Sequence, residues 1–147
     1  MKMHSVAVAG ALMLACLSSQ AFAQTSHDAH GQPGQRAAPS FDAKGIARTE
    51  TVRHDFDSGT DSIQVRVDFA PGASFPRHSH PGVEIAYVLG GWIEYEVDGQ
   101  AVRLQAGQSL YIPAGVVHGA KNTGTGITSE LATYLVEKDK PIVILER

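Results

Sequence analysis

The stretch GASFPRHSHPGVEIAYVLGG, residues 72–91, has the most informative residue spacing in the chain. His78 and His80 are two residues apart, so in a strand their imidazoles face the same side, about 7 Å apart along the chain. Glu84 keeps the same parity, and the Pro-Gly pair before it allows a bend that brings its carboxylate to the two imidazoles. This stretch therefore predicts a cluster of nitrogen and oxygen ligands at one point of the fold.

A second stretch, GQSLYIPAGVVHGAKN, occupies residues 107–122 and contributes one more histidine. His118 follows the turn-forming residues 113–115 and lies within an expected strand. Three imidazoles and one carboxylate suit a mononuclear transition-metal site. The predicted metal ligands are His78, His80, Glu84 and His118.

Short runs of alternating apolar and polar residues surround these two stretches. Ile63, Val65, Val67 and Phe69 alternate with polar residues, which is typical of a half-buried strand. Asp98-Gly99 is a strong signal for a two-residue hairpin turn. Such runs recur at the spacing expected of an all-β sandwich or barrel, and no segment carries a helical stripe. Further strands are expected at residues 84–89, 92–97, 101–104, 110–112, 116–121, 128–136 and 142–145.

The two stretches resemble the two sequence motifs of the cupin superfamily. The first motif is Gly, five residues, His-x-His, three or four residues, Glu, six residues, Gly, and residues 72–91 fit it without a gap. The second is Gly, five residues, Pro-x-Gly, two residues, His, three residues, Asn, and residues 107–122 fit it equally well. The spacer of 15 residues between them is similar to that of small microbial cupins.

The resemblance implies an all-β fold, the double-stranded β-helix or jelly roll of a cupin barrel. It also implies that the four predicted ligands hold the metal of that family. The remaining motif residues are interpreted as turn-formers, and Asn122 as a turn or strand-end polar residue. The turn-formers are Gly72, Gly91, Gly107, Pro113 and Gly115.

Residues 1–23 read as a signal peptide that is cleaved. Lys2 precedes an apolar run, and Ala21-Phe22-Ala23 is a small-x-small cleavage pattern. The run is too short to span a membrane, which takes about 20 residues. A membrane anchor and a lipoprotein signal using Cys16 are the alternatives. We expect a periplasmic or secreted protein with no membrane association after cleavage.

Residues 24–46 form an expected flexible tether, because they are rich in Gln, Gly, Pro, Ala and Ser. Residues 47–147 are the expected barrel. The chain has 147 residues and one Cys, which excludes an internal disulfide framework and a Cys-rich zinc module. A formal net charge of −3 argues against nucleic acid as a partner.

The expected cofactor is one divalent transition-metal ion. Export favours Cu or Zn, which the cell cannot easily withhold outside the cytoplasm and which both outrank Mn and Fe for a nitrogen-rich site in the Irving–Williams order; Fe, Mn or Ni are the alternatives. The predicted function is a metal-dependent enzyme acting on a small oxygenated molecule, either dioxygenase-like or a Lewis-acid isomerase or lyase. A non-catalytic module that binds metal or a small ligand for sensing, storage or delivery is the alternative. Small cupins often pair, so a homodimer is expected.

The inward parity of the metal-bearing strand gives Ala86 and Val88, which predicts an apolar cavity wall and leaves Glu84 as the one candidate general base. Arg77 is expected to point away from the site, and His54 to lie on the surface. The aromatic residues of the strands are expected to pack in the core or an interface rather than contact a ligand. They are Tyr87, Trp92, Tyr95, Tyr111 and Tyr134.

Overall fold

The computed structural model describes residues 38–56 and 58–146. The expected leader, residues 1–23, and residues 24–37 of the expected tether lie outside this part. The described residues form ten strands and no helix. Within them there is consequently no helix with the length and hydropathy that a membrane crossing requires.

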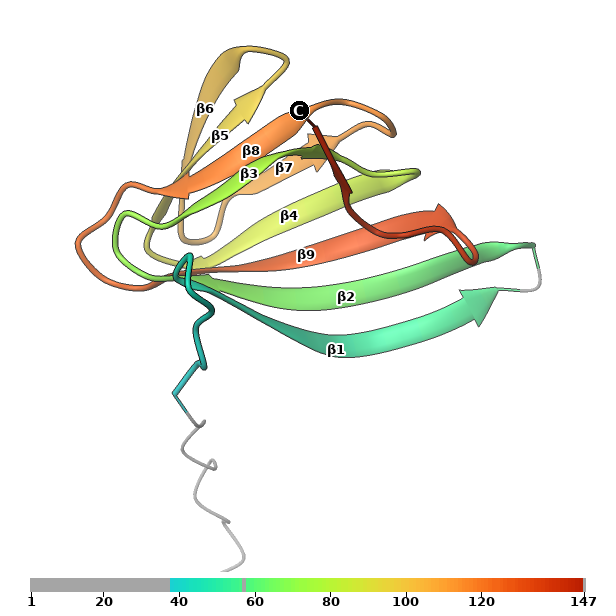
Figure 1. The fold of residues 1–147 in the computed structure, drawn as a ribbon, viewed down its shortest axis with the longest axis horizontal. Coiled ribbons are helices and arrows are strands. Elements are labelled where there is room, and N and C mark those ends of the chain that lie inside the picture. Colours follow the sequence, from blue (N-terminus) through green and yellow to red (C-terminus); the bar gives the residue numbers. More distant parts are fainter. Residues whose placement is uncertain (1–37, 57, 147) are drawn as a thin grey trace, which may run out of the picture. The chain divides into compact units, whose positions relative to one another are not determined.

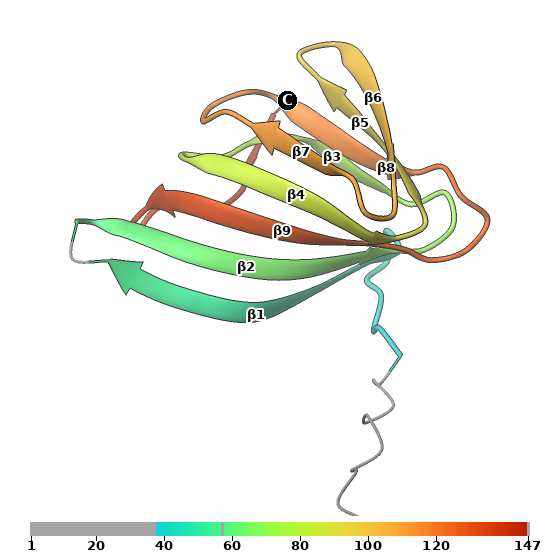
Figure 2. The same cartoon turned by 180° about the vertical axis from the view of Figure 1, so that it is seen from behind.

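The strands form two antiparallel five-stranded sheets, which confirms the expected all-β double-stranded β-helix. Figures 1 and 2 show the sheets as two layers facing each other. In order across the first sheet lie β1 (Ile46–Phe56), β2 (Thr60–Phe69), β9 (Thr128–Glu137), β4 (Val83–Gly90) and β7 (Ser109–Ile112). In order across the second lie β10 (Ile144–Leu145), β3 (Ser74–Ser79), β8 (His118–Asn122), β5 (Trp92–Val97) and β6 (Gln100–Gln105).

The core lies between the two sheets and follows the period-two alternation of the strands. All four apolar residues of the alternating run in β2 are buried. On β4, Ala86 and Val88 are fully buried, whereas Ile85, between Glu84 and Ala86, is exposed. The face of the strand on which a side chain lies therefore decides whether it can reach the space between the sheets, where the metal is expected.

Several strand ends differ from the prediction. β8 begins at His118 rather than at residue 116, and β10 covers only Ile144–Leu145 of the expected 142–145. β1 begins at Ile46, one residue before the expected start of the barrel. Asp42 Oδ1 accepts hydrogen bonds from the backbone N–H groups of Lys44 (2.8 Å) and Ile46 (2.9 Å), so an Asx-type turn precedes this strand.

Asn122 ties together the chain segments at one end of the sheets, in agreement with its interpretation as a strand-end polar residue. The side chain is 1% exposed. Its Nδ2 donates to the carbonyl oxygens of Phe69, Ala70 and Gly126, and its Oδ1 accepts from the Gly124 N–H and the Thr128 hydroxyl. Such a satisfied buried amide has a structural role.

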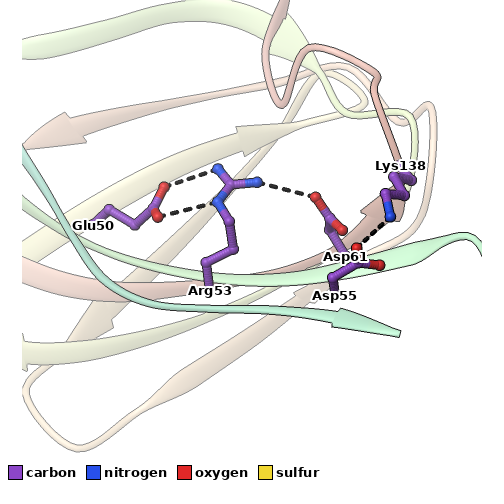
Figure 3. Close-up of polar contacts among 5 residues, drawn as sticks. All are labelled: Glu50, Arg53, Asp55, Asp61 and Lys138. Atoms are coloured by element: carbon purple, nitrogen blue, oxygen red, sulfur yellow. Dashed lines mark hydrogen bonds and ion pairs between the residues drawn. The ribbon is translucent and has the colours of Figure 1, made fainter. Parts of the chain in front are cut away.

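Ion pairs hold the hairpin of β1 and β2 and its neighbour β9 at the other end (Figure 3). Arg53 donates to Glu50 and to Asp61, at 2.9 Å and 3.0 Å, and Lys138 pairs with Asp55. Most of these side chains are exposed, so each pair contributes little to the free energy of unfolding.

Candidate metal centre

Three different strands and one turn bring the four predicted metal ligands to one place between the sheets. His78 lies in β3, His80 directly after it, Glu84 in β4 and His118 at the start of β8. All four residues are at least 95% buried. One potential ligand atom from each residue lies within 4.8 Å of the ligand atoms of the other three.

A bulge and a bend, rather than simple strand parity, bring the histidines of the first motif together. The pairing of β3 with β8 is irregular between Phe75 and His78, after which His78 pairs with His118. The chain then bends, and Gly82 passes directly over β9. A Cβ atom at Gly82 would lie 1.9 Å from the Leu135 carbonyl oxygen, so only glycine allows this crossing.

The backbone orients all three imidazole rings. The Nδ1 atom of each ring lies at a carbonyl oxygen, which can only accept a hydrogen bond. Each Nδ1 therefore carries a proton, so in the neutral ring Nε2 is the nitrogen that offers a lone pair to a metal ion. The contacts are His78 Nδ1 to Pro76 (2.8 Å), His118 Nδ1 to Val116 (3.0 Å) and His80 Nδ1 to Ile142.

Two of these Nε2 atoms meet the Glu84 carboxylate. His80 Nε2 and His118 Nε2 lie 2.9 Å and 3.0 Å from the same oxygen, Glu84 Oε2. His80 Nε2 is fully buried and makes no hydrogen bond within the described part of the chain. A proton on each Nε2 would pair it with the carboxylate, and a divalent metal ion that takes the place of these protons would bind the same atoms. The residues present therefore fit a metal ion.

The charge state of the cluster also suits a metal. Burial alone would raise the pKa of Glu84, but the contacts with His118 and His80 outweigh it and lower the pKa to about 2. Burial, together with the charge of His118, lowers the pKa of His78 to about 4. At neutral pH the carboxylate is therefore ionised and the His78 ring is neutral, as metal coordination requires.

The cluster opens into a narrow cavity with about 20 Å³ of room for the centre of a water molecule. The predicted apolar wall is wrong in part. Ala86 and Val88 are buried as expected but do not line the cavity, whereas the polar residues Arg48, Tyr95, Glu130 and Tyr134 do. The prediction considered only the strand that bears Glu84, whereas these side chains come from β1, β5 and β9.

Glu130 is the residue that the sequence analysis missed. It is 4% exposed and accepts a hydrogen bond from the Tyr95 hydroxyl. Burial, and next the charge of Glu84, raise the pKa of Glu130 to about 8. A signal was present in the sequence, because Glu130 has the same parity in its strand as Ala132, Tyr134 and Val136, which are all buried.

The other residues that the sequence analysis considered fall into three groups. Arg77 points away as expected and donates to Glu96 (2.8 Å), and His54 is exposed. Tyr95 and Tyr134 are buried and line the cavity, so their surroundings include the site as well as the core. The remaining aromatic residues are exposed rather than packed in the core, and these are Tyr87, Trp92 and Tyr111.

The family profile described as "Cupin domain" matches residues 65–134, which include both motifs. The chain belongs to the cupin superfamily. The matched range contains all four residues of the His/Glu cluster and also Glu130, so both ends of the cavity lie inside the cupin domain.

Among known proteins, this cupin is 36% identical over 75 residues to germin-like protein subfamily 2 member 2 of Arabidopsis thaliana, covering 47% of this chain and 34% of the relative. It is 42% identical over 67 residues to the HTH-type transcriptional regulator PuuR of Escherichia coli (strain K12), covering 45% and 36% of the two chains. The cupin thus spans about a third of the length of these relatives. A solved oxalate oxidase matches with a TM-score of 0.60 and 25% identity, over 75% of this chain and 59% of that chain.

Proposed function

We propose that this cupin is a mononuclear metal-dependent enzyme that acts on a small oxygenated molecule. The observation that carries the proposal is the orientation of three imidazole Nε2 atoms and one carboxylate towards one point, with every Nδ1 held by a backbone carbonyl. Such anchoring raises the basicity of a ligand and sets its tautomer. His78, His80, Glu84 and His118 would hold the ion.

A divalent ion bound there would supply a Lewis acid for an anionic substrate oxygen, or a redox centre if it is Fe, Cu or Mn. Four protein ligands leave one or two positions of a five- or six-coordinate ion for the substrate. Similarity to an oxalate oxidase supports dioxygenase-like or related chemistry on a small acid; Lewis-acid isomerase or lyase chemistry uses the same ligands. Glu84 is a candidate general base.

We further propose that the protein is exported to the periplasm or secreted, and that Cu or Zn occupies the site there. A chain that folds outside the cytoplasm acquires its metal where Cu and Zn outcompete Mn and Fe for a nitrogen-rich site. Elemental analysis of protein taken from its native location tests this proposal. Fe or Mn as the dominant metal would contradict it.

The second candidate function is a non-catalytic module that binds a metal or small ligand for sensing. The similarity to PuuR favours this alternative, because a segment similar to this chain occurs in a protein that is named a transcriptional regulator. The buried cluster suits a ligand-sensing site as well as a catalytic one.

We also propose a homodimer formed through the outer face of the first sheet. Ile85, Tyr87, Tyr111 and Leu135 lie on β4, β7 and β9 and are each 41% to 58% exposed. Ile85 pairs with Tyr111 across β4 and β7, so these side chains adjoin. Apolar groups gathered on one face are typical of a protein interface. Sedimentation of wild type and of Tyr111→Glu checks this.

The proposed function is tested by loading the metal-free protein with Co(II) and following the visible absorption of the bound ion. We expect one ion per chain in wild type and in the control His54→Ala, whose imidazole is exposed, and none in His80→Ala. Turnover of oxalate or glycolate, lost in His80→Ala, would support the enzyme. A protein that binds the ion and perturbs its spectrum with glycolate, but converts neither acid, favours the sensing module. Absence of metal binding overturns the enzyme and the metal-binding form of the sensing module.

A further inference from the structure

The cavity has a second polar end that the metal cluster does not use. Glu130 lies on β9 between Val67 of β2 and Val88 of β4, and both valines are buried. The neighbouring inward residue on its own strand is Ala132, which is also buried. An apolar side chain would fill this place without the desolvation cost that a carboxyl group carries. The acid therefore has a role other than packing.

Tyr95 fixes the orientation of this acid from the opposite sheet. The Tyr95 hydroxyl donates to Glu130 Oε2, and both side chains are almost fully buried. In a neutral carboxyl group the carbonyl oxygen is the stronger acceptor, so this bond at Oε2 favours the acid proton on Oε1. No other hydrogen bond to the Glu130 carboxyl group is present among residues 38–56 and 58–146. The O–H group is thus free to donate.

The same cavity has a cation at its rim. Arg48 lines it, is exposed, and places its guanidinium 5.5 Å from the centre of the Phe75 ring. Arg48 makes no ion pair with any described residue. An anion that enters the cavity consequently meets a positive group at the rim, the metal cluster on one wall and a hydrogen-bond donor on another.

We propose that Glu130 is a specificity-determining residue: a carboxylic acid, oriented by Tyr95, that donates a hydrogen bond to the far end of a small two-ended oxyanion whose near end binds at the metal centre. The proposal rests on the proposed function, because it takes the His/Glu cluster as the site of the ion. It names the ligand class as small acids with a second oxygen function, such as dicarboxylates.

The charge of Glu130 then controls binding. The groups that face it are Tyr95 from β5, Glu84 from β4, Arg48 from β1 and Tyr134 from its own strand. His78 and His118, from β3 and β8, line the same cavity. Burial raises the pKa of both tyrosines well above the ordinary value, so they stay neutral when Glu130 ionises. An ionised Glu130 donates no hydrogen bond and repels an anion.

The experiment uses the Co(II)-loaded protein and titrates it with acetate, malonate and succinate, with the visible spectrum of Co(II) as the measure of binding. We expect wild type to bind one of the dicarboxylates at least tenfold more tightly than acetate. Glu130→Leu should reduce this preference to less than twofold while leaving acetate binding unchanged. Glu137→Gln, an exposed change on the same strand, is the control.

Glu130→Gln keeps a hydrogen-bond donor but cannot ionise, so it gives a second measurement if the leucine variant does not fold. We expect wild type to lose its preference for the dicarboxylate as the pH rises and Glu130 ionises, and Glu130→Gln to keep it. Equal binding of acetate and dicarboxylates in wild type, or the same preference in Glu130→Leu, overturns the proposal. In either outcome, an intact Co(II) spectrum shows that the protein still binds the metal, so only the proposal for Glu130 is overturned. If the Co(II) spectrum is absent, the proposed metal-dependent function itself is overturned.

Discussion

The two ends of the cavity each contain a buried glutamate, and the two behave in opposite ways. Glu84 and Glu130 are 3% and 4% exposed and lie on adjacent strands of the same sheet. Contacts with two imidazoles lower the pKa of Glu84 to about 2, despite burial. Burial, and next the charge of Glu84, raise the pKa of Glu130 to about 8, although the hydrogen bond from Tyr95 lowers it.

The difference teaches that burial alone does not decide the charge of a carboxyl group; the neighbouring groups do. At neutral pH one end of the cavity presents an ionised ligand and the other an uncharged acid. Pairs of acids whose pKa values are pushed apart in this way are typical of functional sites. Four changes to the chain test how far this division holds.

The largest effect is expected on metal affinity. Glu84→Gln removes the one negative ligand, so the dissociation constant for Zn(II) should rise by more than about 100-fold. Glu130 lies at the other end of the cavity, so Glu130→Gln should change the dissociation constant for Zn(II) by less than about threefold. Competition with a chromophoric chelator measures both. Equal losses in the two variants would mean that both acids hold the ion.

The pH dependence of stability in the metal-free protein comes next. The pKa of Glu130 is about 8 in the folded state, against an ordinary value of 4.5. The folded state therefore holds this proton more tightly, so its contribution to stability is complete below about pH 4.5 and is lost as the pH rises through 8. Between these values the free energy of unfolding falls by about 1.4 kcal/mol per pH unit from this group.

Glu130→Gln should remove that slope, because glutamine does not titrate. Urea unfolding of the metal-free proteins at pH 5.5, 6.5 and 7.5, taken as wild type minus variant, isolates the contribution of this residue. Parallel curves for the two proteins would show that Glu130 is already ionised at the lowest of these values.

Tyr95→Phe should have a smaller effect, a loss of about 1–3 kcal/mol in the free energy of unfolding, because it leaves a buried carboxyl oxygen without its donor. Tyr111→Phe is the matched control, since Tyr111 is 58% exposed, and should change stability by less than about 0.5 kcal/mol. If both variants change the free energy of unfolding by the same amount, the hydrogen bond from the Tyr95 hydroxyl to Glu130 does not stabilise the fold.

The smallest effect is expected far from the cavity, at the exposed pairs of Figure 3. Arg53→Ala breaks the contacts with Glu50 and Asp61. Exposed pairs contribute about 0–1 kcal/mol, so the loss should stay below about 1 kcal/mol and shrink in high salt. Zinc affinity should not change. A larger loss that is insensitive to salt would assign Arg53 a packing role.

Much of the fold was predictable because strands carry a local period of two. The alternating run in β2 and the hairpin at Asp98-Gly99 appear where the pattern expects them. The four members of the His/Glu cluster were identified from spacing and from the cupin motifs. Their neighbours were not, since the bulge before His78 and the crossing at Gly82 depend on pairing with distant strands.

The sequence by itself determined the all-β class, the two motifs and the four residues of the cluster, because these depend on spacing within short segments. Only the tertiary structure decided what surrounds them. The ring of His80 is anchored by a carbonyl 62 residues away, and Glu130 meets a tyrosine 35 residues away in the other sheet. The alternation of side chains along a strand determines which face each side chain lies on. The pairing of strands and the packing of the two sheets determine which residues it contacts there.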